Sequence, residues 1–236
     1  DIIYKVSFMK NEITFPKSTI KFLTALSKNN NKEWFEKNRI RYEFELLQPA
    51  VQFVIDLGEK LSELSPNINA IPKVNKSIFR LYRDVRFSKN KAPFKTNLGL
   101  YFWEGLGKKM ECSGLYFHIE PKLFFLGSGM YQFTADQLKK YRELVSDPLK
   151  GKELNDLVNK LLKNKKYQLG GKTYKKTPSG FDPDYKYNEL LLHSGFYVYY
   201  ESKDFSELTK KDPVITSYKI FKELFPVHKW FVENLV

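Results

Sequence analysis

The chain has 236 residues, of which 42% are hydrophobic and 16% aromatic, so it has ample apolar material for a folded core. Its formal net charge of +13 permits a polyanionic partner such as nucleic acid. However, the basic residues are 34 Lys and only 6 Arg, a ratio typical of lysines dispersed over a solvated surface. A lone cysteine, Cys112, excludes an intrachain disulfide and any cysteine-based zinc finger or iron–sulfur cluster, and no apolar run has the length of a membrane span. We therefore expect a reducing, cytoplasmic setting.

Helical spacing dominates the first third of the chain, after a lead-in over residues 1–15 that we expect to be extended. A first helix is predicted to begin near Pro16 and to end at the "NNN" of residues 29–31. Asn31 is a suitable cap for a second helix, which Pro49 kinks or restarts and which continues to about Leu64.

The middle of the chain changes to a strand-like composition, with segments rich in aromatic and β-branched residues. Pro121 and Lys122 separate two of these segments and predict an antiparallel hairpin. The predicted strands are Ser77–Phe87, Leu98–Trp103, Gly114–Glu120, Lys122–Gly129 and Gly195–Ser202.

Helices and one long loop are expected elsewhere in the second half. Thr134 and Gln137 form a capping box for a helix that stops at Asp147, and a second helix is predicted from about Lys152 to Leu162. The Lys, Gly and Pro-rich residues 163–185 indicate a surface loop with room for a short hairpin. Two closing helices are expected over residues 216–224 and 227–235.

The absence of an internal repeat or a clear linker favours a single α+β domain over residues 16–236. We expect a largely antiparallel sheet packed with N-terminal and C-terminal helices. A division into two domains near Ile71 is the alternative.

The segment Arg80–Thr96 combines clustered arginines with a loop of hydrogen-bond donors. Strand alternation places Arg80, Tyr82, Asp84 and Arg86 on one face, while Arg83 falls on the apolar face. We predict that this face and the following loop bind an anionic small ligand, a phosphate or a carboxylate. The predicted ligand-binding residues are Arg80, Tyr82, Arg83, Arg86, Ser88, Lys89, Lys91, Lys95 and Thr96.

Three acidic or basic side chains are predicted as catalytic acids or bases beside that pocket, namely Asp84, His118 and Glu120. His118 and Glu120 share a strand face with Tyr116. A mononuclear metal site would need a third ligand, for which Asp84 and His193 are the available residues, and we predict no metal because a His–Glu pair is more often structural. The sequence identifies no cofactor.

The order of several long motifs resembles the family called Domain of Unknown Function 2461. These motifs are "FLTALSKNNNKEWFEKNRIRYE", "PKVNKSIFRLYRDVRFSKNKAPFKTNLG", "GLYFHIEP", "FLGSGMY" and "FDPDY", and the likeness runs from about Phe22 to Phe231. The resemblance implies one compact domain and bacterial-type proteins, and it implies no reaction. Phe94 stands where the family commonly has a tyrosine, which argues against an essential hydroxyl there. Eleven residues of this chain match the family's central motif, namely Arg80, Arg83, Asp84, Arg86, Phe87, Ser88, Lys89, Lys91, Pro93, Lys95 and Thr96.

Three functional hypotheses follow, and they leave open whether the protein is an enzyme. The first is the anion pocket. The second is a nucleic-acid-binding module that uses the basic surface and the lysines of residues 163–176. The third is an interaction protein in which the arginines only hold the fold together, paired with Asp84, Glu120 or Glu201.

Overall fold

A computed structural model describes residues 15–235, and within them five antiparallel strands form one sheet in the order β1-β2-β3-β5-β4. The predicted hairpin is confirmed, because Glu120 pairs with Leu123 across the turn. The expected lead-in lies outside the described residues except for Phe15. The strands are β1 (Leu98–Glu104), β2 (Ser113–Glu120), β3 (Leu123–Met130), β4 (Tyr167–Lys172) and β5 (His193–Ser202).

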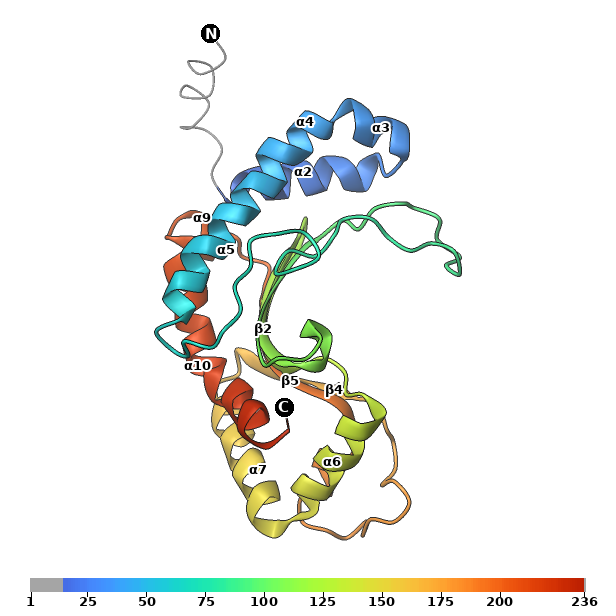
Figure 1. The fold of residues 1–236 in the computed structure, drawn as a ribbon, viewed down its shortest axis with the longest axis vertical. Coiled ribbons are helices and arrows are strands. Elements are labelled where there is room, and N and C mark those ends of the chain that lie inside the picture. Colours follow the sequence, from blue (N-terminus) through green and yellow to red (C-terminus); the bar gives the residue numbers. More distant parts are fainter. Residues whose placement is uncertain (1–14, 236) are drawn as a thin grey trace.

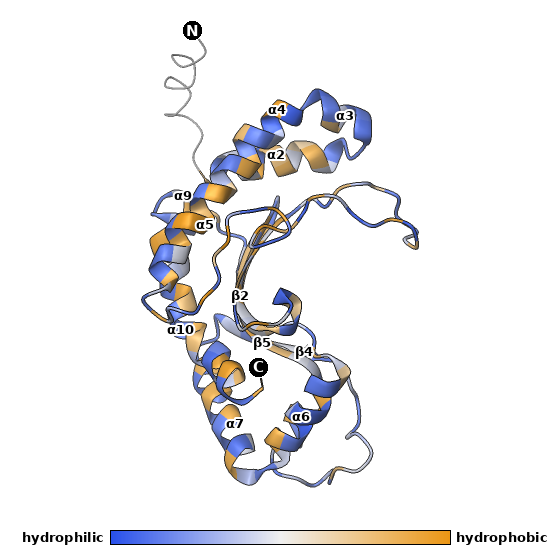
Figure 2. Cartoon of the chain, in the orientation of Figure 1, coloured by the Kyte–Doolittle hydropathy of each residue, from blue (hydrophilic) through white to orange (hydrophobic). Residues whose placement is uncertain are grey.

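Helices cover one face of this sheet, and together with it they confirm the predicted α+β domain (Figure 1). Alternation along β2 turns Leu115, Phe117 and Ile119 into the core, where each is fully buried. The long helix α10 (Pro213–Asn234) packs on β2, β3 and β5 and also on α5 (Gln48–Leu61). Figure 2 shows orange hydrophobic stretches on both helices, as burial against the sheet requires.

The N-terminal helices follow the sequence pattern closely. Asn31 caps α3 (Lys32–Lys37) by accepting a hydrogen bond from the Trp34 amide, after α2 (Lys17–Lys28) has ended. The chain then continues through α4 (Arg39–Arg41) and a π-helical segment (Tyr42–Leu47) directly into α5. Pro49 lies in the first turn of α5, where the π-helical segment changes to an α-helix, so the predicted restart is present without an end to the helical path.

Four details in the second half differ from prediction. The capping box of α6 (Ala135–Ser146) is confirmed, but α7 (Pro148–Leu162) begins at its proline rather than near Lys152. β4 forms inside the predicted loop by pairing with β5, and the short helices α8 (Asn188–Leu191) and α9 (Ser206–Thr209) were not expected. The two predicted closing helices are one, because the buried face of α10 continues on both sides of Pro226.

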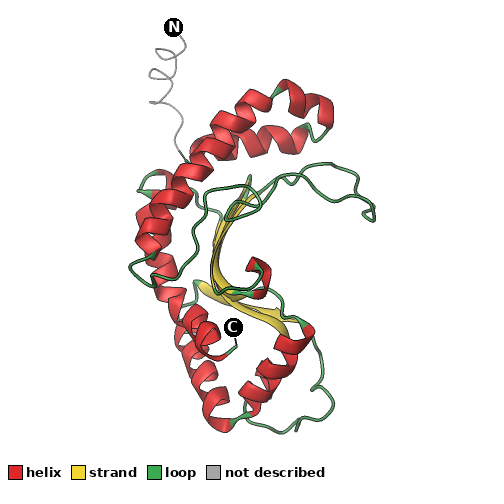
Figure 3. Ribbon diagram, in the orientation of Figure 1, coloured by secondary structure: helices red, strands yellow, loops and turns green. Residues whose placement is uncertain are grey.

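The predicted strand over residues 77–87 is wrong. This segment makes only isolated bridges, from Ile78 to Val74 and Leu100 and from Tyr82 to Phe94, and Figure 3 draws it as loop. The alternation fails because Phe87, expected in the core, is 96% exposed. Residues 80–95 instead form a projecting loop that we call the basic arm, tied at its base where the Asn30 side chain bonds the Phe94 amide and carbonyl at 3.1 and 2.9 Å.

Candidate functional site

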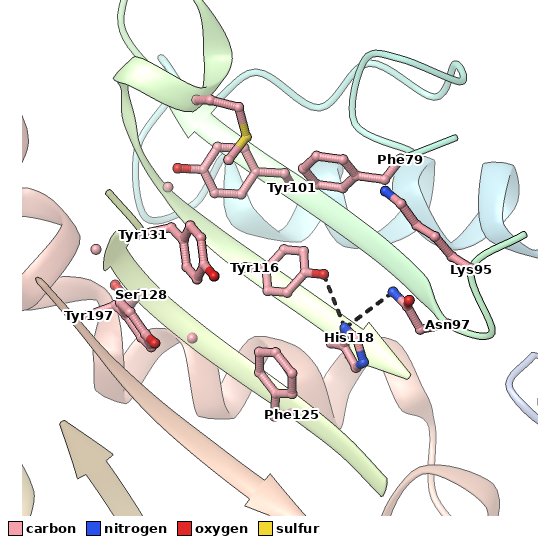
Figure 4. A pocket seen from close by; sticks show the side chains of 14 residues that line it. Phe79, Lys95, Asn97, Tyr101, Tyr116, His118, Phe125, Ser128, Tyr131 and Tyr197 are labelled. Atoms are coloured by element: carbon pink, nitrogen blue, oxygen red, sulfur yellow. Dashed lines mark hydrogen bonds between the residues drawn. The ribbon is translucent and has the colours of Figure 1, made fainter. Parts of the chain in front are cut away.

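The sheet face opposite the helices holds a pocket of about 340 Å³ (Figure 4). Strands β1, β2, β3 and β5 form its floor, and the base of the basic arm contributes one wall. Its lining is mostly apolar and rich in phenylalanine and tyrosine rings, with few polar groups. The lining residues are Phe79, Lys95, Asn97, Tyr101, Met110, Gly114, Tyr116, His118, Phe125, Gly127, Ser128, Gly129, Tyr131 and Tyr197.

Glycines on this face allow tyrosine rings to lie flat on neighbouring strands. A Cβ atom on Gly114 would stand 2.5 Å from Cζ of Tyr101, and one on Gly99 would stand 2.5 Å from the hydroxyl of Tyr116. A larger residue at either glycine would push a ring off the sheet. The alternation of glycine with aromatic residues therefore creates both the floor of the pocket and its depth.

His118 is the polar centre of the pocket floor. Its Nδ1 lies 3.1 Å from the Tyr116 hydroxyl and 3.4 Å from Nδ2 of Asn97, and since the amide nitrogen can only donate, Nδ1 is the acceptor. The ring proton is then on Nε2, which lies 3.6 Å from Oε2 of Glu120. Burial lowers the pKa of His118 more than Glu120 raises it, and the ring stacks on Phe125 with centroids 4.5 Å apart. The histidine is therefore neutral at pH 7.

Positive charge collects at the rim beside Phe79. The Nζ atoms of Lys95 and Lys109 lie 5.6 and 4.1 Å from the centroid of the Phe79 ring. Burial lowers the pKa of Lys95, and the charge of Arg80 lowers it further. Within residues 15–235, none of these three cations forms an ion pair. The rim thus carries positive charge without a neutralising carboxylate.

Most of the predicted arginine face is separate from this pocket and is occupied by contacts within the basic arm. Arg86 pairs with Asp84 at 2.7 Å, at the surface. Arg83 donates to the Ala92 carbonyl at 3.0 Å and lies 3.4 Å from the Ser88 hydroxyl. Both arginines therefore bond within the arm, and of the carboxylate pairings that the third hypothesis named, the Arg86–Asp84 pair is present.

The remaining predicted residues also divide between arm and pocket. Lys91 donates to the Val85 carbonyl at 3.1 Å, Tyr82 packs against Phe94, and Lys89 is exposed on the arm. Thr96 lies beside Lys95 at the base of the arm and is not part of the lining. Of the predicted ligand-binding residues, Lys95 lines the pocket. Arg80 is not a lining residue, but its positive charge lowers the pKa of Lys95.

The possible third metal ligands do not join His118 and Glu120. Across residues 15–235, no three His, Cys, Asp or Glu side chains come together as a metal site would require. Asp84 is held by Arg86, and the buried ring of His193 lies against the carbonyls of Glu189 and Leu190.

Sequence reasoning assigned none of the phenylalanine and tyrosine side chains that line the pocket to the candidate site. Phe79, Asn97, Tyr131 and Tyr197 come from four separate segments that only the strand order brings together. The available signal was the recurrence of glycine beside aromatic residues in "LGLYFW", "GLYFH" and "GFYVYY", which marks a sheet face that is left hollow rather than packed.

These features define an α+β protein with one helix-covered sheet face and one open, aromatic face. The chain belongs to the family described as conserved hypothetical protein (DUF2461), whose model matches residues 18–230 and confirms the resemblance seen in the sequence. No curated protein and no solved structure matches the chain. None of the helices in the described part of the chain has the length and apolar character needed to cross a membrane.

Proposed function

We propose that the open-face pocket binds a small ligand that combines a flat apolar ring with a negatively charged group. The observation that carries this proposal is the part-buried ammonium group of Lys95, which borders an aromatic cavity and has no carboxylate partner among the described residues. Apart from its contact with the Phe79 ring, this cation has lost hydration without gaining a counter-ion, which a bound anion would supply.

The aromatic lining supports the ring component of the ligand. A cavity of about 340 Å³ is in the size range of small-molecule sites, which are mostly apolar with a few placed polar groups. Tyr131 and Tyr197 stand with ring centroids 5.8 Å apart on one side, and Phe125 and Tyr116 at 5.5 Å on the other. These side chains present ring faces and edges to an entering planar group.

The rim supports the charged component. Lys95 is the cation that lines the pocket, and the charges of Arg80 and Lys109 act on it, so an anionic substituent bound to Lys95 gains from three positive charges while its ring remains over the sheet. This proposal keeps the predicted anion-binding function but moves its centre from the arginines of the arm to the lysine at its base.

Among the predicted catalytic residues, His118 is the one that lines the pocket, with Glu120 against its Nε2. Because Nδ1 accepts from the Tyr116 hydroxyl, a proton taken from a bound ligand would reach the imidazole through that hydroxyl, which passes its own proton to Nδ1, and Glu120 would then stabilise the imidazolium. Asp84 has no part in this proposal, because Arg86 holds it on the arm.

The first test fills the pocket without disturbing the fold. A Cβ on Gly127 would meet its nearest atom, Cβ of Tyr199, at an ordinary 3.4 Å, so Gly127→Val adds methyl groups to the cavity. We expect 1-naphthyl phosphate to raise the melting temperature of the wild type more than inorganic phosphate or 1-naphthol does, and this increment to be lost in Gly127→Val. Gly107→Val, in an exposed loop, is the matched control and should behave as wild type.

A second test removes the rim charge. Lys95→Gln is expected to weaken 1-naphthyl phosphate about tenfold while leaving 1-naphthol unchanged, since a charge-assisted hydrogen bond is worth about 1.5 kcal/mol or more. Isothermal calorimetry on both probes measures this. Equal weakening of the two probes would contradict the assignment of the anion to Lys95.

The nucleic-acid hypothesis makes a different prediction for the same variants. A basic surface would bind an oligonucleotide with an affinity that falls steeply with salt and that survives Gly127→Val. If only the oligonucleotide binds, and naphthyl phosphate has no effect on wild type, the pocket proposal is wrong.

A further inference from the structure

A second, independent feature is the basic arm, whose two sides are bonded to each other. The Arg83 amide donates to the Pro93 carbonyl at 2.9 Å, and the Lys95 amide donates to the Leu81 carbonyl at 2.8 Å. The Arg83 guanidinium adds a bond of 3.0 Å to the Ala92 carbonyl. The far end of the arm lies clear of the helices and the sheet (Figure 1). These bonds therefore brace the arm even where it does not pack on the rest of the molecule.

An aromatic ring is exposed at the far end of the arm. Phe87 is the one large hydrophobic side chain within residues 84–92 that is left in solvent. The Cζ atom of Arg86 lies 5.8 Å from the centroid of its ring. Covering such a ring with a flat partner removes apolar surface from water, and stacking adds to that gain. The far end thus presents a stacking surface beside a cation.

Positive charge follows the arm from its base to its far end. Arg80 and Lys89 are exposed, and neither has an ion pair or a hydrogen bond with any residue of the described part of the chain. Lys91 donates to backbone carbonyls within the arm, so its charge is not neutralised. Asp84 is the one carboxylate within residues 80–95, and Arg86 pairs with it. The arm therefore carries a net positive charge along its length.

The row of cations continues past the base of the arm to the rim of the open-face pocket. Burial lowers the pKa of Lys109, and the charges of Lys95 and Lys76 lower it further, so these three lysines lie close together. A row of this kind fits a chain-like polyanion, whose successive phosphates can follow it. A flat membrane surface would meet the far end alone, and there Phe87 offers a single ring rather than a continuous apolar face.

We propose that the basic arm binds a single strand of nucleic acid, with phosphates along Arg80, Lys89 and Lys91 and an unpaired base stacked on Phe87. Bases in a duplex already stack on one another, so single strands are favoured. Neither contact distinguishes one base from another, and binding is therefore independent of sequence. This surface differs from the lysines of residues 163–176, and only Lys95 of the arm lines the pocket, so the function proposed there stands or fails separately.

Fluorescence anisotropy with labelled oligothymidine and oligouridine strands tests the charge contacts. If about four phosphates are contacted, wild-type affinity should fall about fiftyfold between about 50 and 200 mM KCl. Lys89→Gln should weaken binding about fivefold at about 0.1 M salt and reduce the salt slope by about 0.7. The matched control is Lys165→Gln, an exposed lysine of the segment 163–176, which should bind as wild type.

Variants of Phe87 test the stacking, and they leave the fold intact because the ring is exposed. Phe87→Leu should bind at least about fivefold more weakly with an unchanged salt slope, whereas Phe87→Tyr keeps wild-type affinity. A membrane contact would instead tolerate leucine, so vesicles of phosphatidylserine and phosphatidylcholine serve as the competing probe.

Four results would overturn the proposal. These are absence of saturable oligonucleotide binding to the wild type, wild-type affinity in Lys89→Gln or Phe87→Leu, equal weakening by Lys165→Gln and Lys89→Gln, and tighter binding of a duplex or of the vesicles than of single strands. Gly127→Val fills the open-face pocket and should leave oligonucleotide binding intact, which separates this site from the pocket.

Discussion

Gly129→Ala is expected to lower the free energy of unfolding by about 4 kcal/mol, because the backbone at this position leaves no room for a side chain. Gly129 has a φ of +130°, and a Cβ there would stand 2.3 Å from the Phe196 carbonyl oxygen and 2.9 Å from Cα of Tyr197. Both contacts are with the backbone of β5, so relief requires β3 and β5 to separate. Urea unfolding followed by circular dichroism measures the loss.

Gly127→Ala is the matched control, two residues earlier on the same strand and on the same face. Its added Cβ would have an ordinary contact of 3.4 Å with Tyr199, and its φ lies outside the left-handed region. We expect a change within about 0.5 kcal/mol, because alanine also restricts the unfolded chain. Equal losses in the two variants would show that side-chain volume on this face, rather than the backbone approach at Gly129, sets the cost.

The elements that sequence reasoning located correctly are those whose signals are local. The β2–β3 hairpin depends on the turn at Pro121, the start of α6 on Thr134 and Gln137, and the start of α3 on Asn31. In each case, a few adjacent residues satisfy their own backbone groups. Such contacts do not require knowledge of the rest of the fold.

The errors occur where a distant partner decides the structure. Residues 77–87 have strand-like composition, but a strand forms only where a neighbouring strand accepts its hydrogen bonds, and here the backbone meets β1 only near Ile78. The opposite error concerns β4, whose sequence "YQLGGK" is poor in strand formers, yet it pairs with β5 and accommodates an irregular register near Gly171.

The candidate site divides in the same way. Alternation correctly placed His118, Glu120 and Tyr116 on the face opposite the core, because the period of two is a property of the strand itself. The arginine face could not be placed, since it assumed a strand that does not form. Arg83 and Arg86 bind within their own loop instead, a pairing that depends on how residues 88–92 fold back.

Acid is expected to destabilise this protein steeply, because burial lowers the pKa of all three of its histidines. His228 is fully buried, with Nδ1 3.0 Å from the Ser113 hydroxyl and Nε2 3.3 Å from Glu104, and burial outweighs the carboxylate. His193 lies against backbone carbonyls, and His118 lies in the pocket floor.

The direction of the effect follows from where protons bind. A histidine in the unfolded chain takes up its proton near pH 6.5, whereas the same residue in the fold does so only at a lower pH. Below about pH 6.5 the unfolded state therefore holds more protons, and each one adds a slope of about 1.4 kcal/mol per pH unit. Stability is fully present above that pH and falls by up to about 4 kcal/mol per unit as the three histidines titrate together.

Urea midpoints measured between about pH 7.5 and pH 5 test this expectation, and His118→Gln shows how the slope divides among the histidines. Glutamine can still accept from Tyr116 and Asn97 but takes up no proton, so the slope should become shallower while the stability near pH 7.5 changes little. A variant slope equal to that of wild type would mean that His118 binds its proton equally well in the folded protein. In that case Glu120 offsets the effect of burial, and His118 would become a cation as the pH falls through about 6.5, adding its charge to that of Lys95 in the pocket.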